Sequence, residues 1–181
     1  DAARLEHRPG LLESHASAAG GCAATRRAGG CVRAAGRVRA AAASRITAAG
    51  GRVVGIIPDF LKNRESMLHE AQELVVVPDM HTRKRMMFER ADAFVALPGG
   101  VGTLEELVEQ LTWVQLDQHA KPVLIADLGG FWRPLLDLFG HMRHAGFIRQ
   151  GFEVRYLVAE RIDEIIPMLR AAAGRARGEA K

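Results

Sequence analysis

The segment ALPGGVGTLEELVEQL, residues 96–111, joins an apolar run to an acidic helical pattern through three glycines and a threonine. The run that leads into it, AFVALPG at 93–99, is typical of a buried strand that ends at proline and glycine. Glycine lets the backbone approach an anion closely and adopt positive φ. The first N–H groups of a helix are unpaired and favour negative charge. A strand, a glycine-rich turn and a helix in this order predict a phosphate site that contains Gly99, Gly100, Gly102 and Thr103.

The spacing of these glycines excludes two common nucleotide fingerprints. The segment matches neither GxGxxG, which is typical of dinucleotide binding, nor GxxxxGK[ST], which is typical of NTP binding. It also lacks the lysine of a P-loop, which argues against an NTPase.

Short apolar runs that end at Pro, Gly or Asp alternate with helical patterns along the rest of the chain. This alternation predicts an α/β fold with a parallel sheet that is covered on both faces. The expected strands are 52–58, 73–79, 93–99, 122–128 and, more weakly, 153–159, and the expected helices are 80–91, 103–118, 131–145 and 162–173.

The first 45 residues differ in composition from the remainder. They hold 14 alanines, eight arginines and six glycines but no aromatic residue, so they offer little to a sheet. Residues 46–169 carry a net charge of −4, whereas residues 1–45 carry +5 and residues 170–181 carry +3. We therefore expect an atypical segment at 1–45, disordered or misframed, a folded domain at 46–173 and a basic tail at 174–181.

Composition also limits the classes of function. The chain contains no run of eighteen apolar residues, so no membrane span is expected. Cys22 and Cys31 do not have the spacing of metal ligands. A reduced, cytoplasmic protein is the expectation. The basic ends favour weak binding to nucleic-acid phosphates, but the acidic body makes a nucleic-acid partner the least favoured hypothesis.

Two alternatives stay open for Glu106. Thr103 and Glu106 form a T-x-x-E pattern before an apolar run, which is typical of a capping box in which the glutamate bonds back to the helix start. If the loop binds phosphate instead, the Glu106 carboxylate is available to contact the sugar of the nucleotide.

The segment PDMHTRKRMMFERADAF, residues 78–94, places Arg83, Lys84 and Arg85 at the start of a predicted helix. Cations at a helix start oppose the helix dipole, which suggests an anionic partner. The alternative is a solvated basic face.

PGGVGTLEE and DMHTRKRMMFERADAFVALPGG together resemble the LOG family, cytokinin riboside 5′-monophosphate phosphoribohydrolases that were historically mislabelled as lysine decarboxylases. The likeness runs from about residue 48 to residue 148. It implies that residues 46–173 form a nucleotide-binding catalytic domain with a Rossmann-like three-layer fold, usually dimeric. Such a domain would cleave the N-glycosidic bond of a nucleoside 5′-monophosphate such as AMP or prenylated AMP. Nothing in the chain resembles a pyridoxal-phosphate lysine site.

The resemblance also implies roles for particular residues. Gly99, Gly100, Gly102 and Thr103 would bind the 5′-phosphate, Arg83 and Glu106 would be the catalytic pair, and Lys84 would contact the substrate. No cofactor or metal is implied. Homodimerisation is expected.

The N-terminal segment departs from the family pattern. The family begins with strands that end in CGSS-like and YGGG-like turns, and neither turn occurs at 1–45. A divergent N-terminus, an out-of-frame translation and a degraded paralogue are three explanations, of which the abrupt change of composition favours the second. With N-terminal strands atypical or missing, a non-catalytic nucleotide-monophosphate-binding protein is the alternative function.

Overall fold

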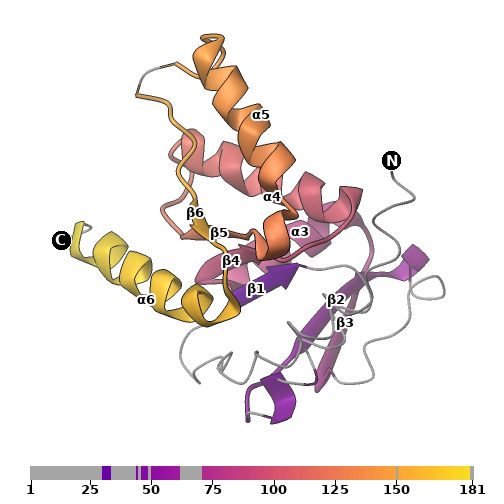
Figure 1. Ribbon diagram of the computed structural model, residues 1–181. Coiled ribbons are helices and arrows are strands. Elements are labelled where there is room, and N and C mark those ends of the chain that lie inside the picture. Colours follow the sequence, from indigo (N-terminus) through magenta and orange to yellow (C-terminus); the bar gives the residue numbers. More distant parts are fainter. Residues whose placement is uncertain are drawn as a thin grey trace. The chain divides into compact units, whose positions relative to one another are not determined.

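The computed structural model of the chain describes residues 30–33, 44, 46–48, 50–61, 71–149 and 151–179, with the backbone alone at 30–33 and 175–179. The chain forms two compact units (Figure 1). The first comprises residues 1–28 and 36–90, and the second comprises residues 29–35 and 91–181. Most of the predicted segment 1–45 lies outside the described residues.

The first unit contains a parallel pair of strands and a helix. Strand β2 (Val54–Pro58) pairs with β3 (Glu73–Val77), and helix α3 (Met80–Arg90) contacts both strands. The start of β3 is tied to its surroundings by Glu73, whose carboxylate accepts hydrogen bonds from Arg52 at 2.6 Å and Arg90 at 3.1 Å. These elements confirm the strands predicted at 52–58 and 73–79 and the helix predicted at 80–91.

The second unit is built on a four-stranded sheet in the order β1-β4-β5-β6, with every neighbouring pair parallel. The strands and helices of this unit are β1 (Gly30–Arg33), β4 (Ala93–Ala96), α4 (Val101–Gln115), β5 (Val123–Ala126), α5 (Arg133–His144), β6 (Leu157–Ala159) and α6 (Ile162–Glu179). The α/β class and the parallel sheet are therefore confirmed. Helix α6 continues beyond the predicted end at residue 173, into the predicted basic tail.

Strand β1 corrects the expectation that the first 45 residues offer little to a sheet. Its residues pair with β4, with Gly30 opposite Ala93 and Arg33 opposite Ala96. Ladder hydrogen bonds come from the backbone, so a segment that is poor in β-branched residues can still occupy a strand position beside an apolar neighbour.

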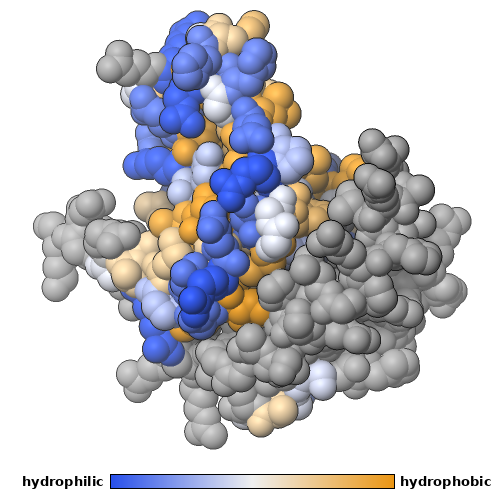
Figure 2. All heavy atoms as spheres, viewed as in Figure 1, coloured by the Kyte–Doolittle hydropathy of each residue, from blue (hydrophilic) through white to orange (hydrophobic). Residues whose placement is uncertain are grey.

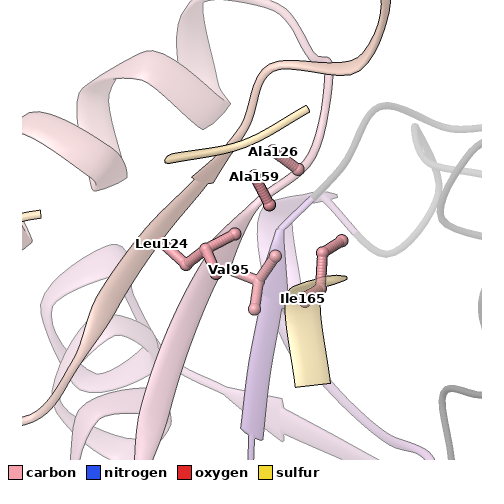
Figure 3. Packing of buried hydrophobic residues seen from close by; sticks show 5 residues of the cluster. All are labelled: Val95, Leu124, Ala126, Ala159 and Ile165. Carbon is pink, nitrogen blue, oxygen red and sulfur yellow. The ribbon is translucent and has the colours of Figure 1, made fainter. Parts of the chain in front are cut away.

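Helices cover both faces of this sheet. Val95, Leu124, Ala126 and Ala159 form one buried cluster with Ile165 of α6 (Figure 3). In Figure 1, α6 lies on the opposite side of these strands from α4 and α5. Because successive side chains of a strand point to opposite faces, each strand of the layer contributes to both interfaces. This explains why β5 is buried along its whole length.

Helix α5 is amphipathic. Phe139 is buried and its ring lies 5.8 Å from that of Tyr156, whereas most of the remaining helix surface is polar. Hydrophilic residues accordingly dominate over α5 on the face drawn in Figure 2. Among the described residues, no helix has both the length and the apolarity needed to cross a bilayer.

Replacing Leu124 with alanine tests the importance of this core. Leu124 is 0 % exposed, so the Leu124→Ala variant should lose about 2–5 kcal/mol of unfolding free energy through lost apolar burial and the cavity left behind. Leu138, which is 45 % exposed on α5, is the control, and Leu138→Ala should change stability by only about 0.5 kcal/mol. Urea denaturation followed by circular dichroism measures both, and equal losses would contradict the assigned core.

Candidate active site

The glycine-rich segment forms the predicted strand–loop–helix unit. Strand β4 ends at Ala96, residues 97–100 form the connection, and α4 begins at Val101 with Gly100 as its N-cap. The carbonyl of Gly100 accepts hydrogen bonds from the N–H groups of Thr103 at 3.0 Å and Leu104 at 3.1 Å. The loop therefore leads directly into a helix whose first two N–H groups, at Val101 and Gly102, have no intrahelical acceptor.

The glycines of this loop do not adopt the positive φ that the sequence suggested. The described glycines with positive φ lie elsewhere in the chain, and Gly100 is extended with φ −86° and ψ −164°. Gly99 is needed for close packing instead, because an added Cβ would lie 2.8 Å from Cβ of Thr103 and overlap its hydroxyl group. An added Cβ at Gly100 would meet no atom within 4 Å, so this side of the loop is open.

The structure contradicts the capping-box interpretation of Glu106. Helix α4 begins two residues before Thr103, and no side chain caps its first turn. Thr103 and Glu106 lie inside the helix, 5 % and 8 % exposed, on the face that also buries Leu107. A carboxylate is costly to bury, so its position one turn beyond the glycine loop has to be explained by something other than helix capping.

Arg83 lies on α3, in the other unit of the chain. Asp79 caps this helix, because its carboxylate accepts hydrogen bonds from the backbone N–H of Thr82 at 2.7 Å and from the Thr82 hydroxyl at 3.1 Å. The backbone hydrogen bond from Thr82 is the main reason why the pKa of Asp79 lies below its usual value. The cap holds the turn from which Arg83 projects.

The basic cluster of α3 is not uniformly solvated. Arg85 is exposed, as a solvated face requires, but Arg83 is only 5 % exposed and Lys84 is half-buried. One Arg83 nitrogen lies 3.9 Å from the sulfur of Met80. The solvated-face interpretation is therefore wrong for Arg83, the member of the cluster that the family resemblance singles out.

The structure thus places Gly99, Gly100, Gly102, Thr103 and Glu106 on one continuous loop and helix in the second unit. Arg83 and Lys84 lie on α3 in the first unit. Within the described part of the chain, no group of three or more His, Cys, Asp or Glu side chains has the arrangement of a metal site.

Sequence reasoning missed a second polar element at the same edge of the sheet as the glycine loop. Asp127 directly follows β5 and is 1 % exposed. Its Oδ1 accepts a hydrogen bond from the backbone N–H of Trp132 at 2.7 Å, and its Oδ2 forms an ion pair with Arg133 at 3.1 Å. A polar residue directly after a fully apolar strand, as in PVLIADL, was the available signal.

Arg133 connects the ends of two strands. Its guanidinium also bonds to Glu160, which follows β6, at 2.8 Å. This hydrogen bond, together with the charge of Asp127, raises the pKa of Arg133 above its already high usual value. The buried carboxylate of Asp127 is therefore compensated by a cation that stays charged at every physiological pH.

Trp132 has a buried hydrogen-bond donor that nothing in the described part of the chain satisfies. The residue is 5 % exposed, its ring packs edge-on against Phe131 at 5.0 Å, and its indole nitrogen has no acceptor among the described residues. An unsatisfied buried donor typically costs about 1–3 kcal/mol.

The outward face of α4 carries exposed apolar side chains among polar ones, which include Glu105, Glu109 and Thr112. Val101 is 82 % exposed and Val108 is 40 % exposed. With Leu104 and Trp113 these residues line an open hollow of about 480 Å³. Helix α4 therefore presents apolar side chains away from the sheet as well as toward it.

Alanine substitutions at Gly99 and Gly100 should have different effects on stability. Gly99→Ala should cost about 1–3 kcal/mol of unfolding free energy, since its Cβ would push Thr103 aside. Gly100→Ala should fold with nearly unchanged stability, because its φ suits alanine and the space beside it is open. Thermal unfolding of the two variants measures this difference. A larger loss of stability in Gly100→Ala than in Gly99→Ala would contradict the loop geometry.

Comparison with known proteins adds to this geometry. The family model described as possible lysine decarboxylase matches residues 39–169. A cytokinin riboside 5′-monophosphate phosphoribohydrolase of Rhodococcoides fascians is 44 % identical over 124 residues, which cover 68 % of this chain and 63 % of the relative. LOG5 of Arabidopsis thaliana, which has the same activity in its name, is 40 % identical over 123 residues, covering 68 % of this chain and 54 % of the relative. The chain thus spans less than two thirds of the length of these relatives.

Among solved structures, the molybdenum cofactor carrier protein of Chlamydomonas reinhardtii has a TM-score of 0.53 and 20 % identity, covering 76 % of this chain and 71 % of the other. At this identity the likeness concerns the fold alone. The family match covers most of the chain and includes both the glycine loop and the Arg83 cluster, and the chain therefore belongs to the LOG family.

Proposed function

We propose that this chain hydrolyses the N-glycosidic bond of nucleoside 5′-monophosphates and releases the free base and ribose 5-phosphate. The observation that carries the proposal is the pairing, on one loop and helix, of an open glycine N-terminus with a buried glutamate one turn further on. The names of its relatives, cytokinin riboside 5′-monophosphate phosphoribohydrolases, support this reaction.

The glycine loop would hold the 5′-phosphate. The open side of Gly100 leaves room for phosphate oxygens beside the backbone. The first N–H groups of α4 point beyond its N-terminus, where the helix dipole is positive and favours an anion. Gly99 and Thr103 keep the loop compact through their contact, and Gly102 adds no side chain to the first turn. Phosphate binding here needs no cofactor.

Glu106 would act on the ribose. It lies three residues beyond Thr103, or about 4.5 Å further along the helix axis. Cleavage breaks the bond between C1′ and the base nitrogen, water supplies the oxygen that bonds to C1′, and a proton is transferred to the departing base. Positive charge develops on the sugar as this bond breaks, and a nearby carboxylate stabilises that charge or activates the water.

Arg83 would be the second catalytic residue, with Lys84 as a further substrate contact. A guanidinium remains protonated even when buried, so the 5 % exposed Arg83 offers a permanent charge for an anion or for orienting a carboxylate. The Asp79 cap supports this role by holding the first turn of α3.

Base release tests the proposal directly. Incubation with AMP and with isopentenyladenosine 5′-monophosphate, analysed by chromatography, should show free base with the parent chain. Glu106→Gln should lower kcat by at least about 100-fold, the typical effect of losing one charge-stabilising group. Glu89→Gln, which changes an exposed glutamate of α3, should release base at the parent rate.

Two outcomes would count against the enzyme. Undiminished release by Glu106→Gln would remove the glutamate from the mechanism. A folded parent that binds AMP but releases no base would favour the alternative, a non-catalytic nucleotide-monophosphate-binding protein.

We also propose that the chain acts in the cytoplasm as a homodimer. The exposed apolar side chains on the outward face of α4, Val101 and Val108 beside the hollow, support a second copy as the partner. Two such faces would remove each other's apolar surface from water.

The dimer can be tested by placing a charge on this face. Sedimentation velocity should show twice the 19.7 kDa chain mass for the parent and a monomer for Val108→Lys, because a lysine would have to be buried at the interface. Leu138→Lys, at a similarly exposed position on α5, should remain dimeric. A monomeric parent, or a dimeric Val108→Lys variant, would exclude this face.

A further inference from the structure

The turn that follows α5 holds an aromatic side chain in water. Gly146 has a positive φ of 78°, and its N–H donates to the carbonyl of Arg143 at 3.1 Å. The next N–H, of Phe147, donates to the carbonyl of Met142 at 2.9 Å. These two bonds form a Schellman motif, in which the residue after the left-handed glycine commonly packs back onto the helix. Phe147 instead is 85 % exposed.

The chain beyond this turn is attached to the C-terminal end of α4. The side-chain amide of Gln115 donates to the carbonyl of Phe152 at 2.7 Å. The guanidinium of Arg155 pairs with Asp117 at 2.7 Å. Helix α5 itself extends away from the strands of its unit, and the turn follows its far end (Figure 1). The aromatic ring of Phe147 is therefore presented by a turn with defined hydrogen bonds, and such preorganisation lowers the entropic cost of binding a partner.

Phe147 is the most exposed large hydrophobic side chain among the described residues. Aromatic side chains supply much of the energy of interfaces when they are buried, and exposed apolar surface with a polar rim is typical of interaction sites. The sequence around Phe147 is basic, because residues 143–155 hold three arginines and one glutamate. A partner for this turn should therefore offer an apolar hollow with acidic side chains beside it.

Helix α4 of the same chain has a surface of this kind. Its open hollow of about 480 Å³ has room for an aromatic ring and is lined by apolar side chains together with carboxylates. The lining residues are Val101, Leu104, Val108 and Trp113, with Glu105, Glu109 and Thr112. Residues 101–115 contain three glutamates and no lysine or arginine. The hollow and the turn are thus opposite in charge, and both are apolar at their centre.

We propose that Phe147 of one copy of the chain occupies the α4 hollow of a second copy, and that the second copy returns the same contact. The inference rests on the homodimer proposed above and names the residue that each copy inserts. Such a reciprocal contact is what a two-fold symmetric interface requires, because each subunit supplies both the inserting side chain and the surface that receives it. The opposite charges of the two surfaces would fix their register.

Photocrosslinking tests this contact in the full chain. The photoreactive p-benzoylphenylalanine replaces Phe147, and the unlabelled variant is mixed with ¹⁵N-labelled parent before illumination. Mass spectrometry of the digest should find the unlabelled peptide of residue 147 joined to a labelled peptide that contains residues 101–115. The same replacement of Phe60, which is 59 % exposed in the first unit, should give no crosslink to residues 101–115. A dimeric sample in which residue 147 crosslinks elsewhere, or to nothing, would overturn the proposal.

The strength of the dimer gives the second test. Phe147→Ala should raise the Kd of the dimer at least tenfold in sedimentation equilibrium, because an anchoring aromatic ring is lost. Its Tm should remain that of the parent when both are monomeric, since the ring is exposed within one chain. Phe60→Ala, the matched exposed phenylalanine, should dimerise like the parent. A parent-like Kd in Phe147→Ala would overturn the proposal.

The outcomes separate this inference from the proposed function. Base release by a dimeric parent that gives no crosslink between residue 147 and α4 would retain the hydrolase and the dimer and remove the contact. A crosslink to α4 without base release would retain the contact and remove the hydrolase. A monomeric parent would overturn the dimer and the contact together, and base release would then be judged for the single chain.

Discussion

Parallel pairing of β4, β5 and β6 is the constraint on which the candidate site depends. Parallel strands in register end at the same edge of the sheet, so the residues that follow each strand lie close together at that edge. The glycine loop follows β4, Asp127 follows β5 and Glu160 follows β6. The apolar cluster around Leu124 and Ile165 holds this arrangement, because it links three strands to α6 through side chains that water does not reach. The packing that stabilises the sheet therefore also fixes the positions of the residues at its edge.

The buried polar side chains among the described residues lie on α3, along α4 and directly after β5. Thr103, Glu106 and Asp127 are each less than 9 % exposed, as is Arg83. Burial of charge opposes folding unless partners compensate it. Asp127 has such compensation in Arg133 and in the backbone of Trp132. Thr103 and Glu106 distinguish the buried face of α4 from an ordinary apolar one.

The two kinds of similarity carry different information. A relative that is 44 % identical supports membership of the LOG family, and the family match includes the glycine loop and the Arg83 cluster. The solved carrier protein, at 20 % identity, shares the architecture alone. Rossmann-like sheets bind many ligands at the carboxyl ends of their strands, so the reaction proposed for this chain is argued from Glu106 and the glycine loop and not from the fold.

The sequence by itself determined the class of fold and the order of its elements. Apolar runs such as PVLIADL and periodic segments such as TLEELVEQL have distinct repeats, and the elements they predicted appear within a few residues of their expected bounds. Local composition did not reveal β1, because its pairing with β4 comes from backbone groups that are the same for every residue. It also left open whether Glu106 caps α4, since T-x-x-E describes a cap only when the helix starts at the threonine. Only the tertiary structure decided that the helix starts earlier, that Glu106 and Arg83 are buried, and that the buried Asp127 accepts the backbone N–H of Trp132. The burial of Glu106 and Arg83 depends on packing against other segments of the chain, and such packing leaves no local pattern in the sequence.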